Sequence, residues 1–298
     1  MIYTITLNPA LDYYMRLNEL RADVQIADKT TVFYGGKGIN VSAVLTELGI
    51  ENKALGFVGG FSGDRLCALL KEKKIATDFV KIEADTRINV KIAGAKNLVI
   101  NAAGPTITFK DEHALIKKLK AINDDDYIVL SGSIPSSMGN SAYERILECV
   151  NRKNAKLIVD TAGKPLFSML KYKPFLIKPN NFELEELMEV HLNNKDDIIL
   201  AAEDLQKMGA QNVLVSMGNQ GMLLLDENGD INMEPIIDGQ VKNTTGCGDS
   251  AVAGFIAGYL KYNDYHKALR YASACANATA FSNTLATKKE IENILNKY

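Results

Sequence analysis

The sequence predicts an α/β fold, with a mostly parallel central sheet flanked by helices and a small β-sheet lid outside it. Short apolar runs alternate with helical patterns along most of the 298 residues, which is typical of βαβ units. Two segments break this alternation and favour strands of a separate layer. Two glycine-rich turns each lead into an amphipathic helix, and such turns often bind ligands.

The strands of the central sheet are expected where short apolar runs are bounded by polar residues. These runs are residues 2–7, 127–130, 157–159, 175–177 and 213–215. Ligands of open α/β sheets bind beyond the carboxyl ends of the strands. Polar residues, which are common in any loop, follow the runs at Asn8, Asp12, Ser131, Ser133, Asp160, Lys178, Asn180 and Ser216.

Residues 12–34 and 86–103 are expected to form the lid. In the second segment, Ile88 and Val90 alternate with Arg87, Asn89 and Lys91, and residues 94–97 are typical of a hairpin turn. Antiparallel strands with one apolar face need a cover. We therefore expect a lid over a ligand site, a contact between two chains, or both.

The turn at residues 243–250 reads NTTGCGDS and carries the clearest chemical signal. Gly246 and Gly248 precede an amphipathic helix, so free backbone N–H groups form an anion site. Asp249 would repel a phosphate but could take a proton from a hydroxyl that attacks it. A plain turn with a first-turn acid remains an alternative. A dinucleotide fingerprint is disfavoured because no strand precedes the turn, and the sequence has no Walker motif.

A second turn, YGGKGIN at residues 34–40, opens another helix. Its glycines allow a ligand close to the backbone, where Lys37 and Asn40 could reach a polyol or a phosphate. The histidines, His113, His191 and His266, are expected on the surface. The four cysteines are too widely spaced for a disulfide framework or a zinc site, and the helix N-terminus is expected to favour a thiolate at Cys247.

Composition excludes several classes of partner. The net charge is −2, without a basic stripe, so neither nucleic acid nor an anionic membrane is expected to bind. No apolar run is long enough for a membrane span, and the expected location is the cytoplasm.

In combination, these turns and several longer segments resemble the ribokinase-type (PfkB) carbohydrate kinase family over essentially the whole chain. The segments are TLNPALD, GGKGINVS, ALGFVGG, TRINVKI, KPFLIKPNNFELEEL, NVLVSMGNQG, TTGCGDS and ATAFSNTLATKKEI. The resemblance implies one ribokinase-like domain over residues 1–298, whose discontinuous lid spans about 12–34 and 86–103. It is greatest to the bacterial 1-phosphofructokinases, with the tagatose-6-phosphate kinases as close relatives.

The resemblance also implies an activity: ATP- and Mg²⁺-dependent phosphorylation of a primary hydroxyl of a phosphorylated ketohexose. The favoured acceptor is fructose 1-phosphate, which gives fructose 1,6-bisphosphate. The alternative is tagatose 6-phosphate, which gives tagatose 1,6-bisphosphate. A homodimer that pairs through the lid is expected.

By position, the resemblance assigns roles to individual residues. Asp249 matches the catalytic base, and the anion hole comprises Gly246, Cys247 and Gly248. The residues on the sugar and sugar-phosphate side are Asp12, Gly36, Lys37, Asn40 and Arg87. Those on the ATP side are Lys178, Asn180, Ser216, Gly218, Gly221 and Asn277, with Glu183 near the magnesium ion.

Other interpretations stay open for three of these residues. Glu183 could be a first-turn helix acid, Arg87 a solvated lid residue, and Asn277 an interior amide. The chain departs from the family at two positions. Cys247 stands where Ala or Ser is common, and Val99 replaces an acidic residue of the second lid strand.

Overall fold

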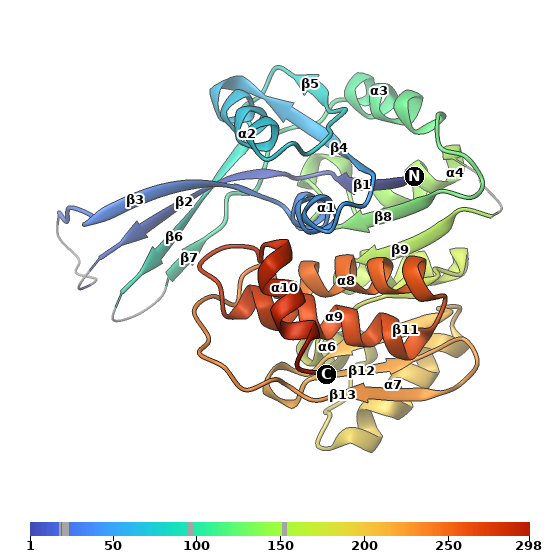
Figure 1. Cartoon of the computed structure of the whole chain (residues 1–298). Helices are drawn as coiled ribbons and strands as arrows, with labels where there is room; N and C mark the ends of the chain where they lie inside the picture. Colours follow the sequence, from blue (N-terminus) through green and yellow to red (C-terminus); the bar gives the residue numbers. More distant parts are fainter. Residues whose placement is uncertain (18, 20–23, 95–97, 151–153) are drawn as a thin grey trace.

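The central sheet runs through the whole molecule in the computed structural model, which describes residues 1–17, 19, 24–94, 98–150 and 154–298. Within these residues it has nine strands: β1 (Ile2–Thr6), β4 (Asn52–Gly59), β5 (Val80–Ile82), β8 (Tyr127–Ser131), β9 (Lys156–Asp160), β10 (Leu176–Ile177), β11 (Asn212–Ser216), β12 (Met222–Leu225) and β13 (Ile231–Glu234). Their order is β13-β12-β11-β10-β9-β8-β1-β4-β5 (Figure 1). Strands β5 to β11 along this order are parallel, and β12 and β13 are antiparallel additions.

Helices cover both faces of this sheet. One face carries α1 (Lys37–Glu47), α8 (Cys247–Tyr262), α9 (Tyr265–Ala280) and α10 (Lys288–Leu295). The other carries α3 (Phe109–Leu119), α4 (Ala142–Val150), α5 (Gly163–Met169), α6 (Asn181–Met188) and α7 (Lys195–Lys207). Helix α2 (Gly60–Glu72) packs beside the lid, and short 3₁₀ turns occupy Ser136–Met138, Leu170–Tyr172 and Gly218–Gln220. Each described helix is too short or too polar to cross a membrane.

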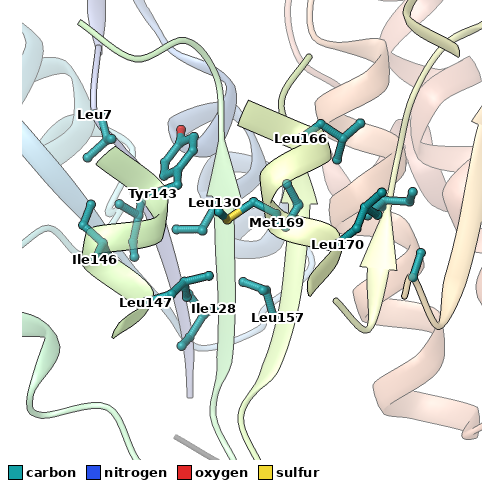
Figure 2. Close-up of a cluster of buried hydrophobic side chains, with 14 of the residues drawn as sticks. Leu7, Ile128, Leu130, Tyr143, Ile146, Leu147, Leu157, Leu166, Met169 and Leu170 are labelled. Carbon is teal, nitrogen blue, oxygen red and sulfur yellow. The ribbon is translucent and has the colours of Figure 1, made fainter. Parts of the chain in front are cut away.

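The five predicted strands are confirmed, and their apolar runs follow from burial on both faces. In β8, Ile128 and Leu130 contact the α4 and α5 side, where Tyr143 and Met169 lie (Figure 2). Val129 points to the opposite layer. Each fully buried apolar side chain of this kind stabilises the folded state by about 1.5–3 kcal/mol relative to an exposed one. Strand β4 was not predicted, because Gly56 and Gly59 interrupt its apolar run.

The lid is a second sheet that projects from the core as an arm (Figure 1). Its strands are β2 (Ala10–Arg16), β3 (Lys29–Gly35), β6 (Arg87–Ala93) and β7 (Leu98–Ile100), in the order β3-β2-β6-β7. The expected antiparallel pairing holds for β2–β3 and β6–β7, whereas β2 and β6 are parallel. Of the predicted hairpin turn, residues 95–97 lie outside the described residues.

The apolar face of the lid is covered within the chain at its base, where the arm joins the core. Leu11 and Ile88 belong to the same hydrophobic cluster as Leu66 and Leu70 of α2. At the edge strand β7, Leu98–Ile100 remains exposed.

Candidate active site

The carboxyl ends of the parallel strands and the N-termini of α1 and α8 meet at one place. Asp160 ends β9 opposite Ser131 of β8, and Lys178 follows β10 directly. Asn40, in the first turn of α1, donates a hydrogen bond of 2.7 Å from Nδ2 to Oδ2 of Asp249, in the first turn of α8. The fold thus brings together residues that lie 209 positions apart in the chain.

The N-terminus of α8 is open to a ligand for two local reasons. Gly246, the N-cap, has φ +82°, a conformation that residues with a Cβ adopt with strain. A Cβ at Gly248 would lie 3.1 Å from Nζ of Lys178, so glycine lets this ammonium approach the helix end. An ammonium group and the positive end of the helix dipole form an anion site.

Asp249 is buried and has the properties of a general base. Its pKa is raised to about 6, first by burial and then by the neighbouring charge of Asp160, while Lys37, Asn40 and Lys178 oppose the shift. A carboxyl group with a pKa near neutrality takes up and releases protons effectively. The hydrogen bond from Asn40 fixes one carboxylate oxygen and leaves the other for a hydroxyl.

Two lysines converge on the buried carboxylate of Asp160. Its Oδ1 lies 3.1 Å from Nζ of Lys37 and 3.4 Å from Nζ of Lys178. Lys37 also lies 3.7 Å from Oε1 of Glu183. Burial alone would lower the pKa of Lys37, but these carboxylates and Asp249 raise it above its usual value. The structure therefore places the Lys37 ammonium group among these carboxylates.

Glu183 and Asn180 form the N-terminus of α6. The Glu183 backbone N–H donates to Oδ1 of Asn180 (2.8 Å), and the Asn180 N–H donates to Oε2 of Glu183 (2.9 Å), which completes a capping box. The first-turn-acid interpretation of Glu183 is thus confirmed. Its other oxygen still faces Lys37, so a carboxylate remains available toward the anion site.

The remaining residues assigned to ATP lie around β11. Asn180 forms a bridge with Ser216, and Gly218 and Gly221 bound the turn that follows β11. Asn277 has a different environment. Its Nδ2 donates to the carbonyl and hydroxyl oxygens of Ser273, and its Oδ1 accepts from the N–H of Ile237. These bonds agree with an interior amide that anchors the segment after β13.

Arg87 lies at a second corner, at the base of the lid. Its Nε donates to the carbonyl of Asn8 (3.1 Å) and its Nη1 to that of Ala102 (3.0 Å). Burial lowers the pKa of Arg87, although the charge of Asp12 opposes this, and among the described residues Arg87 makes no ion pair. The Asn8 side chain donates to Oγ of Ser133 (3.2 Å). A partly buried guanidinium without a carboxylate suits a ligand anion.

Asp12 connects the lid to a cavity of about 190 Å³, which is also lined by Asn40, Lys91 and Tyr14. Asn89 donates to Oδ1 of Asp12 (2.8 Å), and Lys91 pairs with its Oδ2 (2.6 Å). Gly36, assigned to the same side, is the N-cap of α1. Val99 is the cross-strand neighbour of Lys91, so an acidic side chain there would compete with Asp12 for this ammonium.

Cys247 differs from the sequence expectation. Burial and, to a smaller extent, the charge of Asp249 raise the pKa of its thiol to about 11, so the thiol form prevails near neutral pH. The helix N-terminus does not outweigh this burial. All three histidines are exposed, as expected.

Sequence reasoning gave no role to three residues of the site. Asp160, Asn8 and Ser133 were noted only as polar residues after strands. Their position at strand ends was the available signal, but their partners became visible only in the fold. Among the described residues, no group of three or more His, Cys, Asp or Glu side chains could hold a metal ion alone.

The comparisons with known proteins agree with this arrangement. The model of the family described as pfkB family carbohydrate kinase matches residues 5–291. The chain belongs to this family of carbohydrate kinases. It is 38% identical to the 1-phosphofructokinase of Bacillus subtilis (strain 168), over 99% of this chain and 97% of that protein.

Two further relatives bear on the acceptor and the fold. The D-tagatose-1-phosphate kinase of Bacillus licheniformis is 35% identical, over 98% of this chain and 96% of that protein. The structure of phosphofructokinase-2 from Escherichia coli with substrates and products has a TM-score of 0.94 at 25% identity and covers 99% of this chain and 98% of that one. Family membership makes this chain a phosphotransferase with a ribokinase-like fold.

The raised pKa of Asp249 predicts the pH dependence of the reaction. A general base works only when ionised, so kcat/KM should fall as the pH drops below about 6 and level off above it. Asp249→Asn should lose about 10²–10⁴ in kcat and should lose this acid limb. Since burial disfavours the ionised form in the folded state, the variant should remain folded and bind nucleotide. More than about a tenth of wild-type kcat would exclude the assignment.

The pKa of Cys247 predicts resistance to alkylation. With iodoacetamide at pH 7.5, the exposed Cys149 should react about 100-fold faster than Cys247, because the raised pKa and the burial of Cys247 leave little of its thiol ionised or accessible. Peptide mapping by mass spectrometry measures both sites in one sample. Equal labelling of the two cysteines would show that the N-terminus of α8 activates Cys247 after all.

Proposed function

We propose that this protein transfers the γ-phosphate of ATP to the C6 hydroxyl of fructose 1-phosphate and forms fructose 1,6-bisphosphate. The observation that carries the proposal is the buried carboxylate of Asp249 at the anion-binding N-terminus of α8, with a pKa near 6. Arg87 provides a separate cationic corner for a phosphate already on the sugar. One anion site thus serves the transferred group and another serves the acceptor.

In the proposed reaction, the acceptor oxygen attacks the γ-phosphorus, the bond to the ADP oxygen breaks, and the hydroxyl proton passes to Asp249. Asn40 holds Oδ2 of this carboxylate. Lys37, Lys178 and the backbone N–H groups of Gly248 and Asp249 neutralise charge on the phosphoryl group. Positioning and charge neutralisation account for most of the catalysis in reactions of this kind.

A magnesium ion fits the donor set if phosphate oxygens and water supply most of its ligands. Mg²⁺ is commonly bound by one or two carboxylates together with substrate phosphates. Glu183 is the residue that would hold it, directly or through water, since one carboxylate oxygen remains outside the capping box. Bound there, the ion would neutralise charge on the ATP phosphates.

The position of the phosphate on the acceptor is supported by the relatives. The names of the two curated relatives given above specify ketohexose 1-phosphates, whose free primary hydroxyl is at C6. Fructose and tagatose differ only in the configuration at C4. D-tagatose 1-phosphate is therefore the second candidate acceptor, ahead of the tagatose 6-phosphate that the sequence suggested.

We also infer that two chains pair through their lids. Strand β7 is an edge of the lid, and Leu98, Val99 and Ile100 are 39%, 55% and 53% exposed. An exposed apolar edge strand is a template for pairing with another chain.

The acceptor preference is tested by measuring kcat/KM for fructose 1-phosphate, the 1- and 6-phosphates of tagatose, and fructose 6-phosphate. Fructose 1-phosphate should be used best. Arg87→Ala should reduce kcat/KM for fructose 1-phosphate by a factor that corresponds to about 2–5 kcal/mol of transition-state stabilisation, because the proposed desolvated pair between Arg87 and the sugar phosphate is lost. ADP binding should stay unchanged. The exposed Arg65 provides the matched control, Arg65→Ala. A preference for either tagatose phosphate would refute the proposed acceptor.

The inferred dimer is tested by light scattering at micromolar concentration. The wild-type protein should have twice the chain mass of 32.7 kDa, and Val99→Lys should shift it toward the monomer by placing a charge on the edge strand. A wild-type monomer would exclude a stable lid dimer.

A further inference from the structure

Asp160 is a buried charged group to which the proposed reaction gives no step. It ends β9, its side chain is 1% exposed, and its Oδ1 contacts the ammonium groups of both Lys37 and Lys178. Its Oδ2 is buried and, among the described residues, has no hydrogen-bond partner. A carboxylate buried in this way is costly, so its position beside two lysines points to a role.

The two ammonium groups share one oxygen of this carboxylate, although they come from different parts of the fold. Lys37 begins α1, whereas Lys178 follows β10. Both are within 3.4 Å of the same atom, so they are held close together. Two like charges at short range in a poorly solvated site repel strongly unless an opposite charge lies between them.

The pair of lysines faces the place where the phosphoryl group would be transferred. Nζ of Lys178 lies against Gly248 in the first turn of α8. Lys37 lies between Asp160 and Glu183, and its charge also acts on Asp249. Preorganised positive groups at the site of developing charge are the main source of catalysis in phosphoryl transfer.

We propose that Asp160 is a positioning residue, whose Oδ1 holds Lys37 and Lys178 side by side at the N-terminus of α8 for the transferred phosphoryl group. The proposal rests on the proposed function, because it assumes that this anion site is where transfer occurs. It assigns Asp160 no contact with the sugar and no proton transfer.

The Asp160→Asn substitution distinguishes a role in positioning the two lysines from a purely electrostatic effect of the carboxylate. The substitution removes a negative charge from an anion site, so electrostatics alone would keep or strengthen nucleotide binding. Loss of the lysine arrangement should lower kcat about 100-fold, the effect of losing one preorganised donor. We therefore expect kcat to fall and the Kd for ADP, measured by calorimetry without sugar, to stay the same or decrease. A merely structural defect would weaken both together.

Two further variants sharpen this test. Glu112→Gln removes a buried carboxylate paired with Arg145 (2.7 Å) outside the site, and it should leave kcat and the Kd for ADP unchanged. Lys37→Met removes one of the two lysines that Asp160 orders. In this background, Asp160→Asn should lower kcat much less than 100-fold, because residues that act as a unit are not additive.

Several results would overturn the proposal: a change in kcat below about threefold, a parallel loss of kcat and ADP binding, or additive effects with Lys37→Met. A raised magnesium requirement in Asp160→Asn would identify a metal ligand instead. Failure of the proposed function can be distinguished from failure of the Asp160 proposal, because the wild-type enzyme would then be inactive on ketohexose 1-phosphates. ADP binding and kcat with whichever acceptor is used would still test Asp160.

Discussion

The burial of charges of both signs beside one another is the constraint on which the site depends. Asp249 and Asp160 are nearly inaccessible to solvent, and Lys37 and Lys178 lie between or beside them. Removing both lysines would leave the buried carboxylate of Asp160 without a compensating charge. Burial, together with the charge of Asp160, raises the pKa of Asp249 to about 6, while the neighbouring carboxylates raise the pKa of Lys37 against the effect of its own burial. The burial of these charged groups thus both costs folding stability and prepares Asp249 to act as a base.

The fold meets this constraint by bringing strand ends and helix N-termini to one point. Asp160 and Lys178 come from the carboxyl ends of β9 and β10, while Asn40 and Asp249 come from the first turns of α1 and α8. The lid adds a second charged corner around Arg87 and a third around Asp12 and Lys91. Each corner has a different local balance of charge, which in the proposed reaction would orient the two substrates differently.

Much of this could be predicted because the signals are local. Short apolar runs predicted the strands of the central sheet, and glycine turns before amphipathic segments predicted α1 and α8. The alternation of apolar and polar residues predicted the strands of the lid. The predictions that failed or were missing concerned side chains whose environment is set by residues distant in the chain. The thiolate expected at Cys247 followed from its helix position, but tertiary burial decides its pKa. Asp160 gained a role only through Lys37, 123 residues away. For Asn277, the interior amide already considered from the sequence agrees with its bonds to Ser273 and Ile237, the second of which lies 40 residues away.

The most direct test of the central claim is a crystal structure with fructose 1-phosphate, Mg²⁺ and a non-hydrolysable ATP analogue. Our account predicts the C6 hydroxyl within about 2.6–3.2 Å of an Asp249 carboxylate oxygen, the distance required of a general base. It also predicts the γ-phosphate at the N-terminus of α8, between Lys37 and Lys178, and the sugar phosphate at Arg87. A sugar phosphate at the end of α8, or a hydroxyl out of reach of Asp249, would contradict it.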